Sequence, residues 1–222
     1  MGEVRITRRD SLIRLGGFAL TALGVAGLEA RETDAAAVSC VLTPEQTDGP
    51  YYIAGEKLRR NITDGRPGAP LVLRTFVVDA STCKPIRNAA VDIWHADAAG
   101  IYSGFGAGAS NRTFMRGIQR TNAKGLAEFR TVYPGWYQGR TVHIHVKVHV
   151  GGNVAHTGQL YFSDALTDRV YVRAPYSARP NRTTRNADDM IYRNGGRRSL
   201  VAVKKNSAGV YVATITMGVQ RT

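Results

Sequence analysis

The fold class is decided by the stretch RTVHIHVKVHV, residues 140–150. Its side chains alternate between aliphatic and polar, and this period of two is typical of a β-strand with one face in a hydrophobic core. The stretch predicts a strand over residues 141–150. The aliphatic face would hold Val142, Ile144, Val146, Val148 and Val150, and the other face would hold His143, His145, Lys147 and His149.

Five further runs are rich in β-branched and aromatic residues and are bounded by Gly, Pro, Asn or Asp, as strands usually are. They predict strands at 71–78, 89–94, 126–132, 158–162 and 210–217. No long stretch has the 3.6-residue period of a helix, and no repeat of fixed length is present. Many short strands in series predict an all-β fold, a β-sandwich, in which residues 104–117 and 174–198 form long loops suited to carry an active site.

The first 37 residues indicate a targeting segment. The twin arginines Arg8 and Arg9 precede an apolar run at 15–28, and Ala35-Ala36-Ala37 offers a cleavage site. The run is short for a membrane helix, which needs about 20 residues. We therefore expect a twin-arginine signal peptide over 1–37, one mature domain over 38–222, no membrane span after cleavage, and export to the periplasm or the exterior. An uncleaved signal anchor is the alternative.

The chain is strongly basic. Its 222 residues contain 30 Lys and Arg against 17 Asp and Glu, a net charge of +13. Residues 1–37 contain five Arg and five acidic residues, so the charge belongs to the mature domain. Such a surface attracts anions. The basic residues are scattered and no nucleic-acid recognition motif is present, so nucleic acid is not an expected partner.

Two cysteines, Cys40 and Cys83, both lie beyond the expected signal. An oxidising compartment permits a disulfide, so we predict a bond between them. The alternative is a lipid anchor on Cys40, which would leave Cys83 unpaired.

His143 and His145 are the strongest candidates for chemistry. At positions i and i+2 of a strand they project from one face, close enough to share a metal ion, although an isolated pair of this kind equally often lies on a solvent-exposed strand face. Tyr137 comes from an aromatic-rich turn just upstream, and Tyr102 follows the end of the predicted strand at 89–94. Two phenolate oxygens and two imidazole nitrogens favour Fe(III) over Fe(II), Zn or Cu.

These residues belong to a set of motifs that resembles the intradiol ring-cleavage dioxygenases, which include catechol 1,2-dioxygenase and protocatechuate 3,4-dioxygenase. The motifs occur in the family's order along nearly the whole mature chain, as TDGPYY (47–52), VDIWHAD (91–97) with Gly100, Tyr102 and Ser103, PGWY (134–137), Arg140 with HIH (143–145), and QLYF (159–162).

The resemblance implies an iron(III) enzyme of aromatic compound catabolism that uses O2 to open a catechol ring between its two hydroxyls, giving a muconate-type product. It implies that the iron ligands are Tyr102, Tyr137, His143 and His145. It also implies that Arg140 and Gln159 face the substrate, and that Tyr137 is displaced by it and serves as a base. Gly49, Pro50 and Tyr51 would wall the pocket. The helical linker of catechol 1,2-dioxygenases is not recognised, so their mode of dimerisation is not expected, and a homo-oligomer of another kind stays open.

Two alternatives remain. A cupin-like metal site would require an acidic ligand shortly after the histidine pair, but no Glu lies between His145 and His156. A secreted transthyretin-like binding module without catalytic iron would account for the stretch at 78–89 and would need neither the tyrosines nor Arg140. His95 is expected to be structural, and His149 and His156 ordinary polar residues. The sequence does not identify which catechol is cleaved.

Overall fold

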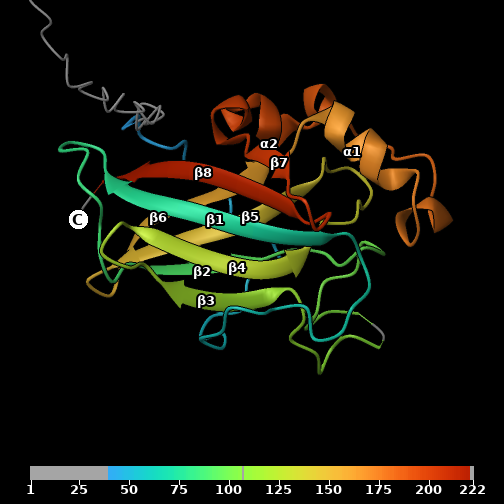
Figure 1. Cartoon of the computed structure of the whole chain (residues 1–222), viewed down its shortest axis with the longest axis horizontal. Coiled ribbons are helices and arrows are strands. Elements are labelled where there is room, and N and C mark those ends of the chain that lie inside the picture. Colours follow the sequence, from blue (N-terminus) through green and yellow to red (C-terminus); the bar gives the residue numbers. More distant parts are fainter. Residues whose placement is uncertain (1–39, 107, 221–222) are drawn as a thin grey trace, which may run out of the picture. The chain divides into compact units, whose positions relative to one another are not determined.

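The computed structural model describes residues 40–106 and 108–220. The predicted signal peptide at 1–37 lies outside the described residues. Within them, eight strands form two four-stranded sheets, ordered β4-β1-β8-β7 and β3-β2-β5-β6, which lie one behind the other in Figure 1. The strands are β1 (Pro70–Asp79), β2 (Ala90–Trp94), β3 (Arg116–Arg120), β4 (Leu126–Val132), β5 (His143–Val150), β6 (Asn153–Tyr161), β7 (Ala202–Lys205) and β8 (Tyr211–Val219). The predicted all-β sandwich is confirmed.

The hydrophobic core lies between the two sheets. Ile144, Val146 and Val148 of β5 are fully buried there, as the alternation in the sequence predicted. They belong to one cluster with Leu73 of β1 and Phe129 of β4 in the opposite sheet. The faces of β5 are thereby fixed, because a shift of one residue would exchange every aliphatic side chain for a polar one. The histidines must therefore point away from the core.

The sequence missed two strands and the helices. β3 has one apolar side chain in the run RGIQR, so it carries little strand pattern; it forms because it pairs with β2, a tertiary effect. β7 is also short and polar. The helices α1 (Asp164–Tyr171) and α2 (Met190–Arg193) are too short to show a helical period, although Ser163 and Asp189 cap them as expected for helix starts. In Figure 1 both helices lie above β8, with α1 toward the right of the view.

The irregular segment 43–62 crosses the outer face of the β3-β2-β5-β6 sheet. Near its start, the Gln46 N–H donates to the Thr157 carbonyl of β6 at 2.9 Å. Further on, the Arg59 N–H donates to the Ile118 carbonyl of β3 at 3.0 Å. The segment therefore spans the sheet from one edge strand to the other and covers the polar face of β5.

Cys40 and Cys83 form a disulfide, which confirms the predicted pairing. It attaches the beginning of the described chain to the turn that follows β1. Among the helices of residues 40–106 and 108–220, none is long and apolar enough to cross a membrane.

Candidate metal centre

His143 and His145 lie on the outer face of β5, but that face is not solvent-exposed. Their side chains retain 3% and 1% of their accessible surface. In the sheet, Tyr161 of β6 is paired with His143, while Gln159 of β6 and Trp94 of β2 flank His145. Directly paired residues share a face of the sheet, so all five side chains lie under the segment 43–62. The hypothesis that the two histidines lie on a solvent-exposed strand face is therefore excluded.

Tyr102 and Tyr137 come from two loops that are held side by side. Tyr102 follows β2, and Tyr137 precedes β5. The Gly135 N–H donates to the Asp97 carbonyl at 3.0 Å. A Cβ atom at Gly135 would lie only 2.4 Å from the carbonyl oxygens of Asp97 and Ala98, so a side chain here would force the loops apart. The close approach of the two loops at Gly135 therefore brings Tyr137 next to Tyr102.

The four predicted ligands converge. The Tyr137 hydroxyl lies 3.2 Å from Nε2 of His143, which in turn lies 3.0 Å from Nε2 of His145. The Tyr102 ring centroid is 5.5 Å from that of Tyr137 and 6.0 Å from that of His145. Side chains from three separate parts of the chain thus surround one small volume.

Several polar atoms in this volume have no adequate partner. Nδ1 of His143 is 2.6 Å from the Thr141 carbonyl, so it carries the proton and leaves the Nε2 lone pair facing the volume. The Tyr102 hydroxyl is buried without a hydrogen-bond partner, and the two Nε2 atoms of His143 and His145 face each other at 3.0 Å; Nδ1 of His145 is also unpaired but lies on the other side of its ring. Buried polar atoms are normally hydrogen-bonded, so such a group calls for an explanation. A cation bound by the Tyr102 oxygen and the two Nε2 atoms would supply one for these three groups.

Burial sets the protonation states of the four side chains. It lowers the pKa of His143 to about 3, with the charge of Arg140 acting in the same direction, and it lowers the pKa of His145 well below its ordinary value. Both imidazoles are therefore neutral, the form that binds metal. Burial also raises the pKa of Tyr102 and of Tyr137. Phenolates at these positions consequently need a nearby cation, and a ferric ion satisfies that need.

In the part of the chain that the structure describes, no group of three or more His, Cys, Asp and Glu side chains is arranged to hold a metal. The candidate centre therefore depends on its tyrosines. That donor set suits Fe(III) better than Zn or Fe(II), which more often take histidine, cysteine or carboxylate ligands.

Arg140 and Gln159 lie beside the four residues and contact each other. Nη2 of Arg140 donates to Oε1 of Gln159 at 2.5 Å, and Nε2 of Gln159 donates to the Thr47 carbonyl at 3.0 Å. Arg140 follows Tyr137 on the same loop, and its side chain keeps 18% of its surface exposed. Both residues are thus placed next to the converging side chains.

The three predicted wall residues differ in their contacts. Tyr51 stacks on Tyr102, with ring centroids 4.2 Å apart and planes inclined by 16°. Gly49 approaches the ring of His145 so closely that an added Cβ would lie 3.3 Å from Cε1. Pro50, between them, is exposed. Tyr51 and Gly49 therefore border the centre directly, and Pro50 shapes the turn that holds them.

Sequence reasoning missed the supporting roles of three residues. Trp94 stacks on His145. Arg116 donates to the carbonyls of Tyr51 and of Ser103, the residue after Tyr102. Asp189 accepts from Arg140. Trp94 stood within a recognised motif, but Arg116 and Asp189 lay in stretches expected to be surface loops, and no local signal marks them.

The remaining histidines lie outside the centre. His95 is buried, with Nδ1 beside the Ala96 carbonyl and Nε2 beside the Thr131 hydroxyl, each at 2.8 Å. His156 is buried against Glu45. His149 is partly exposed near the end of β5. The expected structural role of His95 agrees with its contacts.

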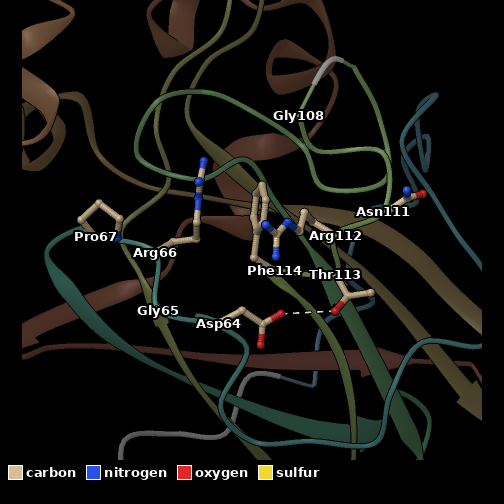
Figure 2. Close-up of a pocket in the computed structure, with 9 residues that line it drawn as sticks. All are labelled: Asp64, Gly65, Arg66, Pro67, Gly108, Asn111, Arg112, Thr113 and Phe114. Atoms are coloured by element: carbon tan, nitrogen blue, oxygen red, sulfur yellow. Dashed lines mark hydrogen bonds between the residues drawn. The ribbon is translucent and has the colours of Figure 1, made fainter.

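A surface cavity of about 470 Å³ lies between the loop at 64–67 and the residues around 108–114 (Figure 2). The guanidinium of Arg66 lies 4.4 Å from the centroid of the Phe114 ring at its edge, and Asp64 accepts a hydrogen bond from Thr113 across it. None of the four candidate ligands lines this cavity. It is separate from the candidate centre.

Comparison with known proteins gives consistent results. The family model described as Dioxygenase matches residues 47–181. Catechol 1,2-dioxygenase 2 of Acinetobacter lwoffii is 38% identical over 107 residues, which are 45% of this chain and 38% of that protein. Catechol 1,2-dioxygenase 1 of the same organism is 36% identical over 43% of this chain and 32% of its own length. The chain thus spans about a third of the length of these curated relatives.

Solved structures match over more of the chain. An intradiol ring-cleavage dioxygenase from Tetranychus urticae superimposes with a TM-score of 0.77 at 35% identity, over 82% of this chain and 95% of that one. The dioxygenase domain of a carbohydrate-binding fusion protein from Streptomyces sp. SirexAA-E superimposes with a TM-score of 0.62 at 30% identity, over 80% of this chain and 97% of that one. The similarity covers the whole sandwich rather than a single motif.

Proposed function

The chain belongs to the intradiol ring-cleavage dioxygenase family, and on that premise we propose that it is a non-haem iron(III) enzyme that opens catechol-type rings between their two hydroxyls. In this proposal Tyr102, Tyr137, His143 and His145 hold the iron. The observation that carries this proposal is the convergence of the Tyr137 hydroxyl with Nε2 of both histidines. The hydroxyl lies 3.2 Å from Nε2 of His143, and that atom lies 3.0 Å from Nε2 of His145.

The iron, when bound, supplies a Lewis acid that lowers the pKa of the catechol hydroxyls and an electronic route for the reaction with O2. The protein must then accept protons from those hydroxyls. Tyr137 suits this task, because its hydroxyl lies next to His143 and its ring is less buried than that of Tyr102. We assign its phenolate oxygen as the acceptor of one of these protons, and the other leaves to solvent.

Arg140 and Gln159 act on the substrate. The guanidinium is permanently charged and planar, so it can stabilise negative charge that develops on the ring oxygens during the reaction with O2. Gln159 holds one edge of that guanidinium through its Oε1 atom. Gly49, Pro50 and Tyr51 form the wall that limits access, with the Tyr51 ring against Tyr102.

The alternatives explain the site less well. A transthyretin-like binding module gives no reason to bury the Tyr102 hydroxyl without a partner beside two neutral imidazoles, which is costly unless a ligand satisfies it. A cupin-like site lacks its carboxylate ligand. We also propose that the protein is exported by the twin-arginine route, on the basis of the sequence at 1–37.

The test begins with the purified full-chain protein reconstituted with Fe(III). We expect a red-brown colour from phenolate-to-iron charge transfer. O2 uptake should accompany loss of catechol, protocatechuate, hydroxyquinol or a chlorocatechol, with both atoms of one O2 found in a muconate-type diacid. A protein that binds no iron, or that consumes no O2 with any of the four, would contradict the proposal.

Tyr137→Phe tests the assigned ligand, with Tyr211→Phe as the matched control because Tyr211 lies on β8 of the other sheet. The first variant should lose part of the visible absorption while retaining some iron, whereas the second should keep the wild-type colour. Unchanged colour in Tyr137→Phe would remove Tyr137 from the ligand set.

A further inference from the structure

Asp189 links the segment after residue 181 to the candidate metal centre. Its side chain is buried, with 1% of its surface exposed, although it lies in a stretch expected to be a surface loop. It also lies beyond residues 47–181, where the family model matches. A buried carboxylate is costly unless its oxygens are well paired, so its contacts indicate what it does.

The two carboxylate oxygens have different partners. Oδ1 accepts from the backbone N–H groups of Ile191 and Tyr192 at 2.8 Å and 3.0 Å, which caps α2. Oδ2 accepts from Nε of Arg140 at 2.9 Å and from the Thr141 N–H at 2.8 Å. One residue therefore anchors a short helix with one oxygen and the entrance of β5 with the other.

The contacts of Oδ2 fix the plane of the Arg140 guanidinium. Nε is held by Asp189 and Nη2 by Gln159, so two edges of the fork are occupied. Within the described residues Nη1 makes no hydrogen bond, which leaves it as the donor available to a substrate. Because the guanidinium is planar, holding two edges fixes the direction of the third.

The same oxygen also acts on a candidate ligand through the backbone. It binds the N–H of Thr141, and the carbonyl of Thr141 lies 2.6 Å from Nδ1 of His143. That contact sets which nitrogen of His143 carries the proton. Partners of this kind orient ligands and commonly change metal affinity or activity 10- to 100-fold when they are removed.

We propose that Asp189 is a positioning residue, which aims Arg140 at the substrate and steadies the backbone that orients His143. Burial alone would raise its pKa, but hydrogen bonds from Thr141, Tyr192 and Arg140 hold the pKa below the ordinary value, so the carboxylate is charged. The inference about catalysis rests on the proposed function. The contact with Arg140 does not.

The test compares Asp189→Asn with Asp188→Asn in the iron-loaded enzyme. Asp188 is the adjacent exposed carboxylate and accepts instead from the Arg185 N–H at 3.3 Å, so it controls for the loss of one charge in this segment. Each carboxylate oxygen of Asp189 accepts from two N–H groups, and the NH2 of an asparagine cannot accept from either pair. One pair of contacts is therefore lost, so we expect kcat to fall at least tenfold with KM changed less than threefold. Asp188→Asn should stay within twofold of wild type.

A double-mutant comparison separates positioning from general damage. In an Arg140→Lys background the guanidinium is absent, so Asp189→Asn should cost at least threefold less in kcat than it does in the wild-type background, and the remaining loss comes from the contact with Thr141. An equal loss in both backgrounds would overturn the role of Asp189 in aiming Arg140. Should Asp189→Asn fail to fold, Asp189→Glu keeps the charge and displaces it, and the same pattern is expected of it.

A magnetic resonance measurement is independent of activity. In full-chain protein loaded with diamagnetic Ga(III), the Arg140 Nε–H signal, assigned by its loss in Arg140→Lys, should exchange slowly with water. It should shift and exchange faster in Asp189→Asn but not in Asp188→Asn. If the Arg140 signal behaves as expected but the iron-loaded protein cleaves no catechol, the proposed function alone is contradicted. If the enzyme is active and Asp189→Asn does not change its kcat, the positioning role alone is contradicted.

Discussion

The indole of Trp94 lies flat against the imidazole of His145, with ring centroids 4.9 Å apart and planes inclined by 5°. His143 has a hydrogen bond from Nδ1 to fix its ring, whereas Nδ1 of His145 has no partner. Stacking is therefore what orients His145. We predict that Trp94→Leu lowers iron affinity about 10- to 100-fold, the range typical of a lost supporting contact.

Competition titration with a ferric chelator measures this affinity. Trp94→Phe is the matched control, because it keeps an aromatic face and should lose much less. Equal affinities for the Leu variant and the wild type would show that the stack does not support His145.

Gly135 determines how closely the two tyrosine-bearing loops approach. A Cβ atom there would meet two carbonyl oxygens at 2.4 Å, and backbone cannot move aside as a side chain can. Gly135→Ala should lower the free energy of unfolding by about 1–3 kcal/mol, the usual cost of overpacking. It should also weaken the visible iron absorption, because Tyr137 is displaced from Tyr102.

Gly139→Ala serves as the control in the same loop. Gly139 has a φ of +81° but open space around its Cβ position, so alanine there costs only conformational strain, about 1–2 kcal/mol. Its iron spectrum should match that of the wild type. If Gly135→Ala gave an unchanged spectrum as well, the close approach would not govern the position of Tyr137.

Arg116 connects two backbone segments beside the candidate centre through hydrogen bonds, one at Tyr51 and one at Ser103. Its buried guanidinium donates to the Tyr51 carbonyl at 2.7 Å and, through Nη2, to the Ser103 carbonyl at 2.7 Å. Arg116→Met should lower the free energy of unfolding by about 3–5 kcal/mol, because the carbonyls and the nearby Glu56 lose a buried cation. Arg116→Lys should not restore stability, because one ammonium cannot reach both carbonyls as the fork does.

Urea denaturation of each variant gives these free energies. Arg120→Met, at the exposed end of β3, is the matched control and should change stability by less than about 0.5 kcal/mol. Wild-type stability in Arg116→Lys would show that the planar fork is not required.

The local pattern of β5 was sufficient to predict which of its side chains enter the core and which lie on the face that carries the candidate centre, because a period of two has one solution once a core exists. Tyr102 and Tyr137 were found through motifs, since their convergence depends on the approach of Gly135 to Asp97. Arg116 and Asp189 were not predictable. Their partners lie far away in the sequence, and a single Arg or Asp in a polar stretch looks the same whether it becomes exposed or buried.

His95 should make stability depend on pH. Burial lowers its pKa from 6.5 to about 4, with opposing contributions from the Ala96 carbonyl and Asp97. As the pH falls, His95 is protonated near pH 6.5 in the unfolded chain but only near pH 4 in the folded protein. Protonation therefore favours the unfolded chain, so this group's contribution to stability is complete above pH 6.5 and is lost as the pH falls. Between pH 7 and 5 the loss should be about 2 kcal/mol.

Urea denaturation of wild type and His95→Gln at both pH values isolates this group, because the other titrating residues are common to the two proteins. The wild type should lose about 2 kcal/mol more than the variant, and parallel losses would mean that His95 titrates normally in the folded state.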